Sequence, residues 1–151
     1  MQDLRTMLEE KDLDEFRAAF DPESLAAANV DAFSTVYPPL SKWAQVTSDT
    51  FFDDAMDARD RERCIIALLA QSGPPLSLAV HIYWGLMEGL TTESVCQAVA
   101  LAGCYGGLPR AAQAMLVLQS VLQMLVDYPA SDTRDATQVF THLLARFSSA
   151  G

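Results

Sequence analysis

The feature that most constrains the fold is a long, nearly uncharged segment that covers residues 64–126. Its charged side chains are Glu88, Glu93 and Arg110. Apolar residues recur in it at helical three- and four-residue spacing, and the alternation that is typical of strands is not sustained. Glycine and proline interrupt the segment at residues 73–75 and 106–109. The sequence therefore predicts an all-α fold, a compact multi-helix domain.

Local start and stop signals place the helices. Asp21 is a candidate N-cap with Pro22 at the first helical position, and Gly89 is a candidate C-cap. Thr91 or Thr92 is expected to cap the helix after it. The helices are expected at 4–20 (one or two short ones), from Pro22 onward, at 41–56, from Asp57 or Asp60 to Ser72, from Pro74-Pro75 to Gly89, from the threonines to Gly106-Gly107, at 109–126 (the longest) and at 132–147.

The charges divide the chain unevenly. Residues 1–56 are rich in acidic side chains and are expected to form an N-terminal helical extension that packs on a core of residues 57–151. At 151 residues the whole should be a single structural domain. Such a domain would struggle to bury the apolar middle in its own core. We therefore expect a homo-oligomer, whose subunit contacts cover the surplus.

Composition also excludes several classes of partner. The net charge of −10 argues against nucleic acid and anionic membrane surfaces, which need clusters of Lys and Arg. The apolar runs are each shorter than the roughly 20 clean residues of a membrane span. The acidic, amphipathic start does not resemble a signal peptide, and three cysteines are an odd number. Free thiols and a cytoplasmic location are the simplest expectation.

His81 is the first candidate site residue. It is one of two histidines and lies within "LAVHIYWGLMEGL", an apolar helical stretch. Imidazole is suited to proton transfer near neutral pH, and the apolar neighbours would favour its neutral form. Alternatively, His81 is a core residue hydrogen-bonded to a carbonyl group. The residue by itself leaves both readings open.

Glu62 is the second candidate, in "RDRERC". Its arginine neighbours suggest a solvated charge cluster, but helical spacing also places it beside Ile65 and Ile66, where a carboxylate can point into a pocket. The thiols Cys64, Cys96 and Cys104 form no C-x-x-C pair and are expected to be small buried hydrophobes. The pattern contains no zinc-site grouping and no phosphate-binding glycine loop after a strand. No metal and no cofactor are expected.

The order of three motifs resembles the carboxymuconolactone decarboxylase / alkylhydroperoxidase D-like superfamily. They are "RERCIIALLA", "LAVHIYWGLMEGLTTESV" and "ALAGCYGGLPRAAQAM". Peroxidase members of that superfamily carry a Glu, a C-x-x-C pair and then a His. The Glu and His positions fall on Glu62 and His81, but the cysteine positions fall on Pro74 and Ser77. The resemblance therefore excludes the C-x-x-C peroxidase chemistry, which needs a nucleophilic and a resolving thiol.

What remains is similar to the decarboxylase members, which act on a γ-lactone carboxylate without a metal or an organic cofactor. The resemblance implies that His81 transfers the proton and that Glu62 orients it or handles a second proton. It also makes four residues candidates for contact with a small-molecule substrate: Tyr83, Trp84, Tyr105 and Arg110. Arg110 could pair with a carboxylate, although a solvent-facing position at a helix start is its simpler alternative. The family further implies trimers or hexamers.

Three functional hypotheses follow. The first is a cofactor-free enzyme that uses His81 and Glu62 on a carbonyl- or lactone-containing small molecule, by decarboxylation, isomerisation or cyclisation. The second is a non-catalytic oligomeric binding or scaffold protein that keeps the fold. The third is residual thiol peroxidase activity through Cys64, Cys96 or Cys104.

Overall fold

The computed structural model describes residues 4, 7–36, 38–39, 42, 46, 55–128 and 136–147. The described residues form seven α-helices and no strand, so the all-α prediction is confirmed. The helices are α1 (Glu10–Ala18), α2 (Pro22–Val36), α4 (Ala58–Ser72), α5 (Pro75–Met87), α6 (Thr92–Gly106), α7 (Leu108–Asp127) and α8 (Ala136–Phe147). The helix expected at 41–56 lies almost entirely outside the described residues.

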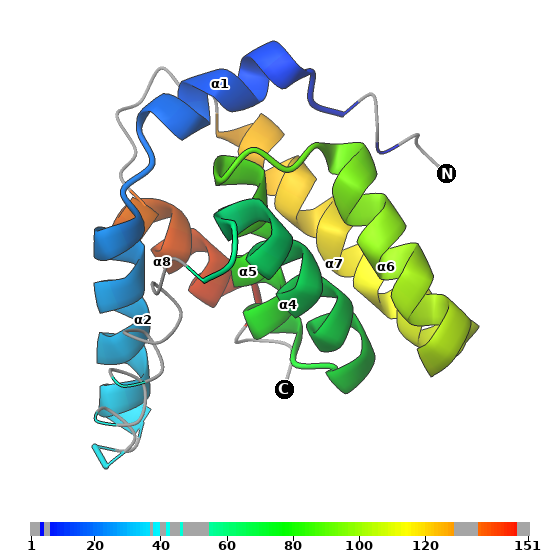
Figure 1. Ribbon diagram of the computed structural model, residues 1–151. Helices are drawn as coiled ribbons and strands as arrows, with labels where there is room; N and C mark the ends of the chain where they lie inside the picture. Colours follow the sequence, from blue (N-terminus) through cyan, green and yellow to red (C-terminus); the bar gives the residue numbers. More distant parts are fainter. Residues whose placement is uncertain are drawn as a thin grey trace.

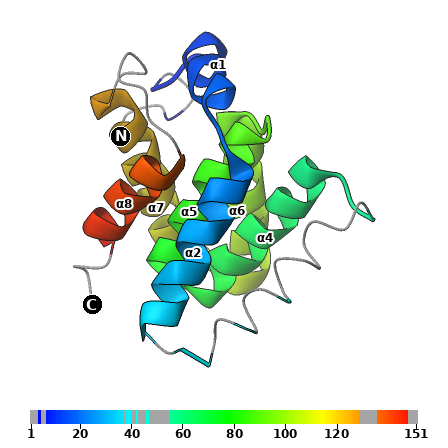
Figure 2. The ribbon, with the colours of Figure 1, turned by 90° about the vertical axis from the view of Figure 1, so that its left-hand side faces the viewer.

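Helices α4 to α7 form the centre of the molecule, and α5 lies in the middle of it (Figure 1). Helix α5 packs against α4, α6, α7 and α8, and α1 crosses one of its ends. Helices α2 and α8 lie side by side on the flank of this bundle (Figure 2). Because α5 is surrounded, nine of its residues are buried, from Leu78 to Met87 with the exception of His81.

The turn between α4 and α5 is built from residues with restricted or unusual backbones. Helix α4 ends at Gly73, which adopts φ +96°, the left-handed conformation that favours glycine. Pro74 then takes the N-cap position and Pro75 the first helical position of α5. The turn folds α5 back against α4, so residues distant in sequence face each other across the two helices.

Side chains cap the helices as expected from the sequence. The Asp57 carboxylate accepts the backbone N–H of Arg59 at 3.0 Å, and this bond lowers the pKa of the carboxyl below its usual value. The Thr91 hydroxyl accepts the backbone N–H of Ser94 at 3.1 Å, so Thr91 rather than Thr92 caps α6. Helix α7 is the longest, as predicted, with 20 residues.

Arg17 of α1 contacts the backbone at the end of α5 and just beyond it. Its Nε donates to the carbonyl oxygen of Leu86 at 2.8 Å, and its Nη2 donates to that of Leu90 at 3.2 Å. The Leu86 carbonyl lies in the last turn of α5 and also accepts the backbone N–H of Gly89 at 3.2 Å, whereas the Leu90 carbonyl lies in the segment that follows the helix. The boundary near residue 56 stays a prediction, because residues 47–54 lie outside the described part of the chain.

We predict that Arg17→Lys lowers the free energy of unfolding by about 1–3 kcal/mol, because one ammonium group cannot hold two carbonyls in the planar geometry of a guanidinium. Chemical denaturation followed by circular dichroism measures the change. Arg63→Lys is the matched control, since Arg63 pairs with Asp60 on the exposed surface at 2.8 Å. Equal effects of the two substitutions would contradict a bracing role for Arg17.

Candidate active site

His81 and Glu62 meet across the contact between α5 and α4. His81 Nδ1 lies 2.8 Å from Glu62 Oε2. The Glu62 side chain is only 4% exposed, whereas a quarter of the His81 side chain reaches the surface. A carboxylate is costly to bury without a partner, and the imidazole is the partner found here. The structure thus brings together the two residues selected from the sequence.

The helix faces explain how Glu62 is buried despite its charged neighbours. Glu62, Ile66 and Ala70 recur at four-residue spacing and form the buried face of α4. The facing residue on α5 is Gly85, where an added Cβ would lie 3.4 Å from Glu62 Cβ and 3.1 Å from Ile66 Cδ1. The glycine therefore allows α5 to approach α4 closely, which lets the Glu62 side chain reach His81, one turn before Gly85 on α5.

The arrangement suits His81 to act as a base. When Glu62 is ionised, Nδ1–H donates to the carboxylate and the lone pair is left on Nε2. The carboxylate then also stabilises the imidazolium formed when Nε2 takes up a proton. Among the described residues Nε2 has no hydrogen-bond partner, and the ring is partly exposed. A small molecule could therefore reach this nitrogen.

Trp84 and Tyr83 both lie on α5 but differ in their contact with the His81–Glu62 pair. The Trp84 ring lies nearly parallel to the His81 ring, with an interplanar angle of 8° and centroids 6.2 Å apart. Its Nε1–H donates to Glu88 at 3.1 Å. Tyr83 is buried and meets the Phe20 ring edge to face at 6.0 Å. The Trp84 ring also meets the Phe20 ring edge to face, at 6.2 Å, so both aromatic residues pack against Phe20, and Trp84 is in addition a neighbour of the pair.

Among the described residues, neither Tyr105 nor Arg110 makes a hydrogen bond, ion pair or ring contact with His81 or Glu62. Tyr105 is 83% exposed near the C-terminal end of α6. Arg110 is the third residue of α7 and lines a cavity, together with residues from the end of α4 and the start of α5. Neither His81 nor Glu62 lines that cavity. The structure therefore places these two candidates separately from the His81–Glu62 pair.

The positions where peroxidase relatives carry cysteines hold a helix start instead. Pro74 is the N-cap of α5 and Ser77 lies in its first turn. All three cysteines are free thiols: Cys64 and Cys104 are exposed and Cys96 is half-buried, so none is the fully buried hydrophobe expected from the sequence. Within the described residues no three His, Cys, Asp or Glu side chains gather as metal ligands. No helix in the described part of the chain has the length and apolar character to cross a membrane.

A sequence model of the carboxymuconolactone decarboxylase family matches residues 40–120, more than half of the chain. The chain belongs to this family. The matched region of this carboxymuconolactone decarboxylase family member contains Glu62, His81, Tyr105 and Arg110, whereas α1 and α2 precede it. No curated protein matches the chain, and no solved structure matches it either.

Sequence reasoning missed Gly85 as a positioning residue of this family member. A signal was available, because a glycine within a run of bulky apolar residues in a helix indicates a close approach of another segment. It also missed Arg17, whose role depends on a contact between residues about seventy positions apart. Nothing local in the sequence indicates that contact.

Proposed function

We propose that the chain is a cofactor-free enzyme in which His81, oriented by Glu62, transfers a proton on a carbonyl- or lactone-containing small molecule. The 2.8 Å contact between a nearly buried carboxylate and a partly exposed imidazole carries the proposal. Membership in the carboxymuconolactone decarboxylase family supports a decarboxylase-like role at the level of the family. The His81–Glu62 mechanism is the specific part of the proposal.

The proton transfer would proceed in two steps. In an isomerisation, Nε2 takes a proton from the carbon next to the carbonyl, and the C–H electron pair moves into the carbonyl group to give an enolate. The imidazolium, stabilised by Glu62, then returns the proton to a different atom. In a decarboxylation the C–CO₂ bond breaks instead, its electrons enter the conjugated carbonyl, and a protonated His81 supplies the proton that replaces CO₂.

The test is turnover of carboxylated γ-lactones and β-keto acids, followed by ¹H NMR in D₂O and by CO₂ release. We expect loss of substrate signal or solvent deuterium at the carbon that His81 protonates. His81→Gln is expected to reduce the rate by about 10²–10⁴-fold, the usual contribution of a general acid or base. The matched control is Cys64→Ser, an exposed position on the helix that carries Glu62. Full turnover by a folded His81→Gln variant would overturn the proposal.

We also propose that the protein is a homo-oligomer, a trimer or hexamer as the family resemblance implies, and that it works in the cytoplasm. Large apolar side chains remain exposed on the helices of the uncharged segment, namely Leu68, Leu101, Leu108 and Leu116. These side chains support the oligomer, because a contact between subunits would remove them from water. Sedimentation equilibrium measures the number of subunits.

The second candidate function is that of a non-catalytic binding protein with the same fold. One observation favours it: the cavity beside Arg110 is not lined by His81 or Glu62. A ligand held in that cavity would not contact the pair. Saturable binding of the same carboxylated γ-lactones or β-keto acids without turnover would support this function over the enzymatic one.

A further inference from the structure

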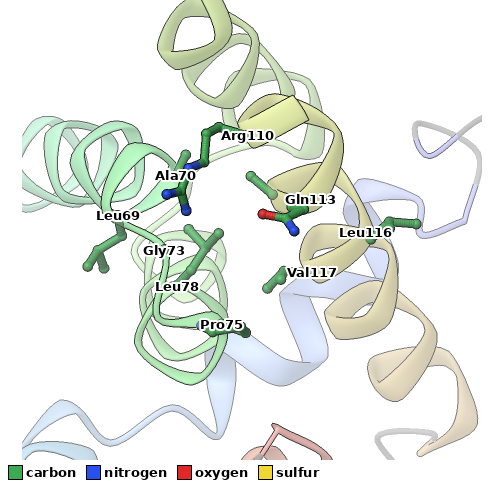
Figure 3. Close-up of a pocket in the computed structure, with 10 residues that line it drawn as sticks. Leu69, Ala70, Gly73, Pro75, Leu78, Arg110, Gln113, Leu116 and Val117 are labelled. Carbon is green, nitrogen blue, oxygen red and sulfur yellow. The ribbon is translucent and has the colours of Figure 1, made fainter. Parts of the chain in front are cut away.

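A cavity of about 430 Å³ lies where the end of α4, the start of α5 and the first turns of α7 meet (Figure 3). Its walls are mostly aliphatic and include Leu69, Leu78, Leu116 and Val117. The polar side chains on its lining are Arg110 and Gln113, which reach from α7 toward α4 and α5. The volume falls within the range of small-molecule sites, roughly 300–1,000 Å³.

Arg110 is an unpaired cation at this cavity. Among the described residues its side chain makes no hydrogen bond or ion pair, as is also the case for Arg146 of α8, whereas Arg17, Arg59 and Arg63 each pair with a carboxylate. Arg110 differs from Arg146 in that it lines this cavity. None of the residues that line the cavity is acidic. The guanidinium is thus left with its donors available to a ligand.

The backbone of the turn makes room for this guanidinium. A Cβ added at Gly73 would lie 2.7 Å from Arg110 Nη1, so a side chain at this position would displace the guanidinium from where it is observed. The same glycine ends α4 in the left-handed conformation. The side chain of Arg110 therefore lies over the turn between α4 and α5, exposed at the rim of the aliphatic walls.

We propose that this cavity binds an aliphatic monocarboxylate. The guanidinium forms paired hydrogen bonds with the carboxylate, and the amide of Gln113 and the positive end of α7 add to the attraction. The aliphatic walls cover the hydrocarbon chain. A single cation matches a single negative charge, and the absence of acidic residues from the lining excludes an amine as the favoured ligand. The site does not depend on the proposed enzymatic function, since neither His81 nor Glu62 belongs to it.

Isothermal titration of the full-length protein with sodium octanoate, octan-1-ol and octan-1-amine tests the proposal. We expect octanoate to bind at least about tenfold more tightly than either of the other two, because only the carboxylate can form an ion pair with two parallel hydrogen bonds to the guanidinium. Arg110→Gln should weaken octanoate binding by a similar factor and leave octan-1-ol binding unchanged. Arg146→Gln is the matched control, a change of another exposed arginine on α8.

Two outcomes would overturn the proposal. One is equal affinity for octanoate and octan-1-ol. The other is unchanged octanoate binding by Arg110→Gln together with a lower melting temperature, which would assign Arg110 to the C-terminal end of α4 instead. His81→Gln should bind octanoate as the unmodified protein does. Loss of binding in that variant would place the carboxylate at the His81–Glu62 pair and also overturn the separate site.

Discussion

Replacing Glu62 with glutamine is expected to lower turnover by about 10²–10⁴-fold while leaving the helical content unchanged. Glutamine has the shape of glutamate, but it carries no charge to stabilise an imidazolium at His81. Its amide can also donate to Nδ1, which would place the ring proton on Nε2 and remove the base. The loss should appear in kcat more than in KM, because Glu62 acts through His81 rather than on the substrate.

Steady-state kinetics across pH values checks this positioning role. The pH profile of kcat should change shape in Glu62→Gln, since a titratable carboxylate no longer lies 2.8 Å from the ring. Glu88→Gln is the matched control. Glu88 accepts a hydrogen bond from Trp84, which lies one turn beyond His81, and Glu88 itself makes no hydrogen bond with the imidazole. A Glu62→Gln variant with the unmodified rate and pH profile would refute the assignment.

Gly85→Val is expected to lower the free energy of unfolding by about 1–3 kcal/mol, the usual cost of overfilling a packed core. Even a single Cβ at this position would lie 2.8 Å from Leu90 Cδ1 and 3.1 Å from Ile66 Cδ1. Both leucine and isoleucine are almost fully buried, so neither side chain can move aside freely. The two further methyl groups of valine would push α5 away from α4 and separate His81 from Glu62.

Chemical denaturation measures this stability change, and turnover measures the separation of the pair. Gly106→Val is the matched control, because the nearest side chain there is that of Gln71, which is exposed and can move. We expect Gly106→Val to change stability by less than about 0.5 kcal/mol. Equal losses at the two glycines would show that the close contact between α4 and α5 is not what makes Gly85 necessary.

The helices could be predicted from the sequence because single residues with a known effect on the backbone mark their ends. Asp57, Gly73, Pro75 and Thr91 act on the backbone next to them, and each is found where its chemistry predicts. The all-α fold follows from the same local rules. The exposure of Cys64 and Cys104 could not be predicted in this way, since burial depends on which face of α4 or α6 a neighbouring helix covers.

The candidate site was predictable in part. The spacing of Glu62 and His81, on either side of a turn at residues 73–75, allows two facing helices to bring them together. Which of the other candidate side chains face the pair depends on how each helix is rotated about its own axis. Trp84 follows His81 by three residues and lies beside its ring, whereas Tyr83 follows by two and contacts Phe20, which Trp84 contacts as well. The exposure of Tyr105 depends on which face of α6 the neighbouring helices cover, and the residues next to Tyr105 in the sequence do not indicate that face.

Arg17 connects a part of the chain that precedes the family match with a part inside it. The family match begins at residue 40, yet the carbonyls at the end of the His81-bearing helix are held by a side chain from α1. The N-terminal region is therefore a component of the scaffold beneath the candidate site. Changes in that region can alter the site during evolution while every residue of the shared motif is retained. Comparisons of activity between family members should accordingly include the segment before the match.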